Sequence, residues 1–202
     1  FNPEPLHLFF DAFTIGDGED STGEIVEVIK AAKAEGLSRE ETLMRLVKVR
    51  GTYVPAFYAA EYNDDNTLKA FYPTREGVPE KVRKCIVTNL DGAKYPVKIP
   101  VPFQEIIHDR IVLEVMRGCT RGCRFCQAGM LYRPVRERKV GTLLKLAEEL
   151  CKNTGYDEVS LSSLSTGDYS CLPQLTRELN ERLVPKRVSI SLPSLRLDKT
   201  LS

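Results

Sequence analysis

The chain has 202 residues, of which 42% are hydrophobic and 28% are charged, with a formal net charge of +1. These values fit one large globular domain or parts of two. The sequence has no run of about 18 apolar residues, which excludes a transmembrane helix, and its start, 1–5, lacks the features of a signal peptide. The sequence begins with Phe1 and not with an initiator Met, so we expect a segment of a longer chain. Because it lacks a secretory signal and its cysteines are clustered, we expect that chain to be cytoplasmic.

Residues 1–52 contain one predicted strand and two predicted helices. The strand, 8–15, runs into a glycine-rich turn. Capping-box spacing at Ser21-Thr22-Gly23-Glu24 and at Ser38-Arg39-Glu40-Glu41 predicts the two helix starts, and Gly36 is expected to end the first helix. One strand and two helices cannot bury a core alone. The unit therefore resembles the end of a doubly wound domain.

The pattern changes over residues 53–109. Two aromatic-rich stretches flank the polar segment 63–66, which predicts a β-hairpin. A proline-rich stretch follows, which predicts an extended connection to the next domain. Its prolines are Pro73, Pro79, Pro96, Pro100 and Pro102.

Residues 110–202 alternate predicted strands with predicted helices. The strands are 110–116, 159–162 and 188–192, and apolar side chains at helical spacing separate them over 143–150 and 172–183. This alternation favours a parallel sheet with helical crossovers. The carboxyl ends of such strands lie at one edge of the sheet, where a barrel of this kind gathers its active site.

A cysteine-rich loop follows the first of these strands. Cys119, Cys123 and Cys126 form a CxxxCxxC pattern, and Gly118 and Gly122 are expected to relieve crowding of its backbone. Thiolates are the usual ligands of iron–sulfur clusters. Three thiolates leave one of four irons without a protein ligand, and such an open iron can bind a further molecule.

Two alternatives remain open for this loop. Zinc prefers four ligands, and the fourth can come from His108, Cys151 or Cys171, although none lies at zinc-finger spacing. The segment from Arg117 to Lys139 also holds six arginines and one lysine against a single acid. Such a basic patch attracts phosphate or carboxylate groups, so an RNA-binding module with a zinc or structural iron–sulfur site is a second hypothesis.

The loop resembles the signature of the radical S-adenosylmethionine superfamily. The likeness comprises the CxxxCxxC spacing after a strand and the aromatic Phe125 before the third cysteine. The flanking segments 113–118, 126–130 and 133–138 are similar to a bacterial subgroup with a cobalamin-binding-like domain ahead of the radical domain.

This resemblance implies a fold and a domain plan. The fold is α/β: the C-terminal part of a doubly wound, cobalamin-binding-like domain, then the first three βα units of a partial (β/α)6 barrel. Residues 1–52 are expected to be the remnant of the leading domain, residues 53–109 the hairpin and connection, and residues 110–202 the first half of the radical domain.

The resemblance also implies cofactors and their ligands. Cys119, Cys123 and Cys126 would hold a 4Fe–4S cluster that binds S-adenosylmethionine, while cobalamin is conceivable but unsupported by these residues. Further cofactor-binding positions follow the three strands, and no residue is assigned a catalytic role; these positions are Phe125, Ser165, Thr166, Gly167, Asp168, Ser194 and Arg196. Equally simple roles exist for them: a turn that caps the next helix at 165–168, and a structural Arg196.

The expected function is reductive cleavage of S-adenosylmethionine to a 5′-deoxyadenosyl radical. An electron donor such as flavodoxin or ferredoxin would be the partner, and no membrane partner is expected. The sequence does not identify the substrate. By analogy with relatives, we expect modification of RNA or protein by methylation or methylthiolation. We expect the 202 residues to be inactive by themselves.

Overall fold

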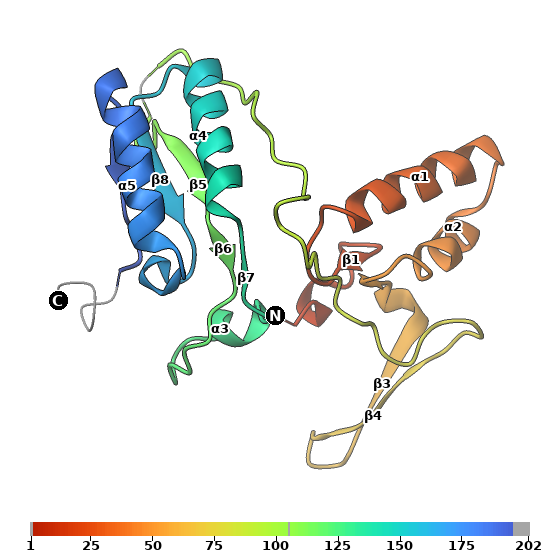
Figure 1. Cartoon of the computed structure of the whole chain (residues 1–202). Coiled ribbons are helices and arrows are strands. Elements are labelled where there is room, and N and C mark those ends of the chain that lie inside the picture. Colours follow the sequence, from red (N-terminus) through yellow and green to blue (C-terminus); the bar gives the residue numbers. More distant parts are fainter. Residues whose placement is uncertain (1, 105, 196–202) are drawn as a thin grey trace. The chain divides into compact units, whose positions relative to one another are not determined.

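The computed structural model describes residues 2–104 and 106–195 (Figure 1). The chain divides into two compact units, Phe1–Val87 and Thr88–Ser202. Each unit has its own core of buried apolar side chains. Within the described ranges, no helix combines the length and the apolar character that a membrane crossing needs.

The first unit packs two helices and two short strands around a small core. Leu43, Leu46, Val54 and Phe57 are buried at its centre. The two-residue strand β1 pairs with β2 in antiparallel fashion. The elements are η1 (Glu4–Leu6), β1 (Phe13–Thr14), α1 (Ser21–Ala34), α2 (Arg39–Leu46), β2 (Thr52–Tyr53), η2 (Pro55–Phe57), β3 (Tyr58–Tyr62) and β4 (Leu68–Pro73).

The strand predicted over residues 8–15 is much shorter in the structure. Only Phe13–Thr14 has a strand partner, and the Leu6 carbonyl accepts a turn hydrogen bond from the Phe9 amide. Leu8 and Phe9 are largely exposed. The apolar run was therefore misleading, because a strand also needs a neighbouring backbone to pair with.

The two predicted capping boxes have opposite outcomes. The Ser38 hydroxyl oxygen accepts a hydrogen bond from the Glu41 amide, and the Glu41 carboxylate accepts one from the Ser38 amide, so α2 begins as predicted. The box predicted at Ser21 is wrong: α1 begins without a side-chain cap, and the Ser21 hydroxyl donates to the Asp17 carbonyl. Gly36 ends α1 with a positive φ of 68°, as expected.

The predicted hairpin is confirmed. Strands β3 and β4 pair in antiparallel fashion around the polar turn, and Asn66 in that turn adopts a positive φ. Tyr58 and Phe71 stack across the two strands, with ring centroids 5.3 Å apart. Cross-strand aromatic pairs of this kind stabilise a hairpin and fix its register.

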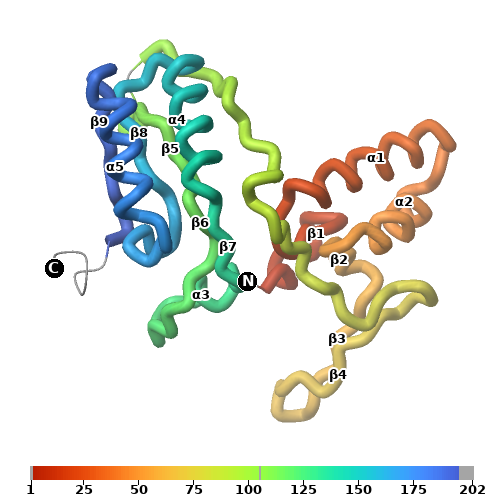
Figure 2. Tube along the Cα trace, in the orientation of Figure 1, coloured from red at the N-terminus to blue at the C-terminus, as the bar shows by residue number. Residues whose placement is uncertain are grey.

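The second unit is built on a three-stranded parallel sheet, as the alternating pattern predicted. The strand order is β5-β8-β9, and helices α4 and α5 lie on one face of the sheet (Figures 1 and 2). The elements are β5 (Ile111–Glu114), β6 (Met116–Arg117), α3 (Ala128–Leu131), β7 (Arg136–Glu137), α4 (Val140–Thr154), β8 (Glu158–Ser162), η3 (Thr166–Asp168), α5 (Leu172–Leu183), η4 (Val184–Lys186) and β9 (Ser189–Ser191).

The two faces of this sheet differ in character because strand side chains alternate. Ile111, Leu113, Val159 and Leu161 point toward the helices and are fully buried with them. On the other face, Val112, Ser160 and Ser191 are paired neighbours on the three strands. Three strands with helices on one face form an open sheet, so closure into a barrel is not seen in the described residues.

A second, two-stranded ladder lies beyond the end of β5. Strand β6 pairs with β7 in antiparallel fashion, with Met116 opposite Glu137 and Arg117 opposite Arg136. The ladder brings the two ends of segment 118–135 together. The cysteines of that segment therefore lie in a closed loop at the carboxyl end of β5.

Candidate functional site

The cysteine loop presents three free thiols in different environments. Cys119 is buried, Cys126 is half-buried and Cys123 is exposed. The Arg121 amide donates to the Cys119 sulfur at 3.4 Å, and the Cys126 amide donates to the Cys123 carbonyl at 3.0 Å. Amide hydrogen bonds to cysteine sulfur are among the contacts that tune iron–sulfur sites.

The two glycines of the loop do not have the same role. Gly118 has a φ of 85°, and a Cβ there would lie 2.7 Å from the carbonyl oxygens of both Tyr132 and Pro134. Gly118 therefore allows the strand to enter the loop. A Cβ at Gly122 would meet nothing within 4 Å, so the expectation that Gly122 relieves crowding is wrong.

These glycines supply a matched pair of variants. We expect Gly118→Ala to destabilise the protein by about 1–3 kcal/mol, because it combines a left-handed backbone with a clash against two carbonyl groups. Gly122→Ala should change the free energy of unfolding by less than about 0.5 kcal/mol. Urea denaturation of both variants measures the difference, and equal stabilities would contradict the account of Gly118.

Most of the arginines in the basic segment are engaged within the chain. Arg117 pairs with Glu114, with 2.7 Å between Nε and Oε1. Arg133 donates to the Gly129 carbonyl at 3.1 Å, and Arg136 donates to the Pro134 carbonyl at 3.1 Å. Arg133 and Arg136 therefore bind the backbone of the cysteine loop, while Arg117 binds the carboxylate of a residue on β5. These contacts give the three arginines a role within the fold.

The segment after β8 forms a compact hydrogen-bonded turn. The Ser165 hydroxyl donates to Asp168 Oδ2 at 2.8 Å, and the hydroxyls of Ser163 and Thr166 lie 3.0 Å apart. Ser165 and Thr166 are buried, whereas Gly167 is exposed. The turn therefore presents the Asp168 carboxylate from a fixed backbone.

The structure brings most of the predicted positions together at the carboxyl edge of the sheet. Arg121 of the cysteine loop donates through Nε to Asp168 Oδ2 at 2.8 Å and through Nη2 to Oδ1. The Thr166 amide donates to the Ser194 carbonyl at 3.3 Å. Thus the segments that follow β5, β8 and β9 are in contact. Arg196 lies outside the described residues.

Phe125 is placed differently from the other predicted positions. The residue is 92% exposed, and it takes no part in the core of the second unit.

The thiols are not arranged as ligands of a single ion. Among residues 2–104 and 106–195, no three His, Cys, Asp or Glu side chains gather as a mononuclear metal site requires. Three free thiols in one closed loop are the ligand set that a 4Fe–4S cluster with one open iron needs.

The other thiols lie elsewhere in the fold. Cys151 is on α4, and burial raises the pKa of its thiol, which disfavours the thiolate that a metal needs. Cys171 precedes α5, and Cys85 is buried in the first unit. None of these three thiols belongs to the cysteine loop.

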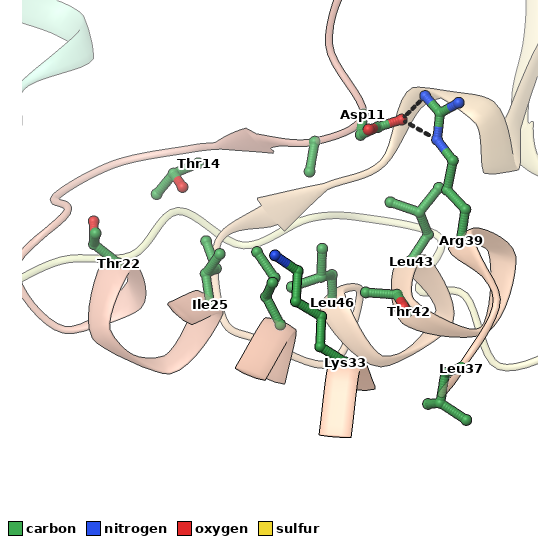
Figure 3. Close-up of a pocket in the computed structure, with 12 residues that line it drawn as sticks. Asp11, Thr14, Thr22, Ile25, Lys33, Leu37, Arg39, Thr42, Leu43 and Leu46 are labelled. Carbon is green, nitrogen blue, oxygen red and sulfur yellow. Dashed lines mark hydrogen bonds and ion pairs between the residues drawn. The ribbon is translucent and has the colours of Figure 1, made fainter. Parts of the chain in front are cut away.

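A separate pocket of about 680 Å³ lies in the first unit, between β1 and helices α1 and α2 (Figure 3). Ile25, Leu43 and Leu46 give it an apolar wall, and an ion pair between Asp11 and Arg39 lies at one end. Its volume is that of a small-molecule site, about 300–1,000 Å³. The pocket contains none of the cysteines or polar turns described above.

The fold and the site define the class of protein. A family model described as "Radical SAM superfamily" matches residues 113–202, and one described as "Radical SAM proteins, N-terminal" matches residues 1–55. Residues 113–202 therefore form a radical SAM domain, and residues 1–55 match the N-terminal domain of radical SAM proteins. The superfamily implies a 4Fe–4S cluster and S-adenosylmethionine as cofactors.

Nearly the whole chain matches part of a longer relative. Over 194 residues the chain is 30% identical to an uncharacterized protein of Methanocaldococcus jannaschii. The match covers 96% of this chain but 35% of the relative, so the chain spans about a third of that protein's length. This relative does not identify a subgroup.

Sequence reasoning missed Arg121 as part of the site. It lies between the first two cysteines, and its partner Asp168 is 47 residues away. No periodicity or spacing rule connects the two, although a charged side chain inside a cysteine loop was a signal worth following.

Proposed function

We propose that the protein is a radical S-adenosylmethionine enzyme whose cysteine loop holds a 4Fe–4S cluster. One observation carries the proposal: a CxxxCxxC loop with three free thiols contacts the polar turn that follows the next parallel strand. The match to the superfamily supports the same cofactor pair.

The chain's own residues have distinct roles in this proposal. Cys119, Cys123 and Cys126 would each ligate one iron, and the fourth iron would be left for the cofactor. Asp168, held by Ser165, offers a carboxylate that can accept hydrogen bonds from the ammonium group of S-adenosylmethionine. When bound and reduced, the cluster supplies the electron that cleaves a carbon–sulfur bond of S-adenosylmethionine to give a 5′-deoxyadenosyl radical.

The proposal also covers the domain plan, the electron donor and the substrate class. We infer that residues 1–52 belong to a cobalamin-binding-like leading domain, residues 53–109 to a connection and residues 110–202 to the first half of a (β/α)6 barrel. A low-potential protein such as ferredoxin or flavodoxin would supply the electron. The substrate would be a macromolecule, RNA or protein, that is methylated or methylthiolated.

The alternative function is a non-catalytic metal-binding module. The exposed thiol of Cys123 is the observation that favours it, because an accessible thiol can also bind zinc. Metal and sulfide analysis of the intact protein after anaerobic reconstitution separates the two. We expect about four iron atoms and four sulfides per chain, whereas one zinc per chain with no iron would contradict the proposed function.

A further inference from the structure

The strongest unassigned feature is the contact between Arg121 and Asp168. The two side chains form a two-pronged pair, Nε to Oδ2 and Nη2 to Oδ1, between the cysteine loop and the turn after β8. Such forked pairs fix geometry as well as charge. The Arg121 side chain is 42% exposed and that of Asp168 is 21% exposed.

The backbone on both sides of this pair is tied to the site. The Arg121 amide donates to the sulfur of Cys119, so the residue contacts a thiol and Asp168 at once. On the other side, the Ser165 hydroxyl donates to Asp168, and the neighbouring Thr166 amide donates to the Ser194 carbonyl. A shift of Arg121 would therefore disturb both the thiol and the polar turn.

Arg124 of the same loop provides the contrast. It is exposed, three residues closer to the third cysteine, and it carries the same charge. General attraction between a basic loop and an anionic cluster would make the two arginines equivalent. The geometry assigns a specific task to Arg121 alone.

We propose that Arg121 is a positioning residue that locks the cysteine loop to the Ser165–Asp168 turn, and so sets the distance between cluster and cofactor. This inference rests on the proposed function and deepens it. Arg121 keeps Cys119 covered before a cluster is present. It also holds the Asp168 carboxylate where the ammonium group of S-adenosylmethionine is to be bound.

The first test needs neither cluster nor cofactor. In the intact metal-free protein, site-resolved mass spectrometry follows alkylation of Cys119 by iodoacetamide. We expect Arg121→Ala to accelerate this reaction about threefold to tenfold, as the loss of a partly exposed two-pronged pair implies. Arg124→Ala should leave the rate unchanged, and Arg121→Lys should lie between, since it keeps the charge without the fork.

A charge-swapped variant separates locking from a general fold defect. Arg121→Asp combined with Asp168→Arg restores an opposite-charge pair, so we expect the Cys119 rate to return toward that of the wild type. Equal rates in Arg121→Ala and Arg124→Ala would overturn the lock, as would a swapped variant that reacts as fast as Arg121→Ala.

The second test measures the cofactor. At matched iron content, equilibrium dialysis should show about tenfold weaker binding of S-adenosylmethionine in Arg121→Ala and in the swapped variant, and wild-type binding in Arg124→Ala. Unchanged affinity in Arg121→Ala would overturn the positioning role. A wild-type protein that binds no S-adenosylmethionine would instead overturn the proposed function, while the alkylation result would still decide the lock.

Discussion

The variants Cys119→Ser, Cys123→Ser and Cys126→Ser are each expected to lose the ability to assemble an iron–sulfur cluster. Each removes a thiolate from a site that has three, and a serine hydroxyl is a much poorer ligand for these irons. Because loss of an outer-shell partner alone costs about 10–100-fold in metal affinity, iron per chain after reconstitution should fall about tenfold or more. Iron and sulfide analysis gives the readout.

Cys151→Ser and Cys171→Ser are the matched controls. Both thiols are half-buried in the same unit, and neither belongs to the loop. They should retain the iron content of the wild type. If Cys151→Ser or Cys171→Ser loses iron as completely as the loop variants do, the cluster is not held by the CxxxCxxC pattern.

The substitution Arg138→Met is expected to cost the largest amount of stability, about 3–5 kcal/mol. The Arg138 side chain is 1% exposed, and its guanidinium donates to the Glu114 carbonyl at 3.1 Å and to the Leu90 carbonyl, and pairs with Glu114 Oε2. It also lies 5.2 Å from the ring centroid of Tyr95. Methionine fills some of the space but removes all three hydrogen bonds, although the Leu90 carbonyl keeps the Ala93 amide as a donor and Glu114 Oε2 keeps Arg117.

Arg124→Met serves as the control for Arg138→Met. It removes the same charge from an exposed position, and it should alter the free energy of unfolding by less than about 0.5 kcal/mol. Urea denaturation of the metal-free protein compares the two. A loss below about 1 kcal/mol in Arg138→Met would mean that the buried network contributes far less than its geometry indicates.

The parallel sheet and the hairpin were predictable because their signals are local and agree with one another. Apolar strands alternate with helical stripes over residues 110–192, and α4 ends at Gly155 in a left-handed conformation. The strand over residues 8–15 was not predictable from its apolar run, because pairing depends on a distant backbone. The helix α1 begins at Ser21, close to where it was predicted, but its capping box is absent because the Ser21 hydroxyl donates to the Asp17 carbonyl.

The residues of the candidate site also fall into a predictable group and an unpredictable group. The three cysteines and the turn at 165–168 could be located from spacing and from the topology of a parallel sheet. The contacts that the arginines make inside the fold could not be predicted, because a run of positive charge does not indicate which carbonyls or carboxylates lie nearby. These arginines are Arg121, Arg133, Arg136 and Arg138. The sequence pattern thus suggested a surface property where the fold has internal hydrogen bonds.

The central claim is that this loop prepares a cluster to cleave S-adenosylmethionine. The most direct measurement is chromatographic detection of 5′-deoxyadenosine after the iron-loaded intact protein is reduced with dithionite in the presence of S-adenosylmethionine. The account predicts 5′-deoxyadenosine and methionine in equal amounts, and none from Cys123→Ser. An intact protein with a full complement of iron and sulfide that yields no 5′-deoxyadenosine would contradict it.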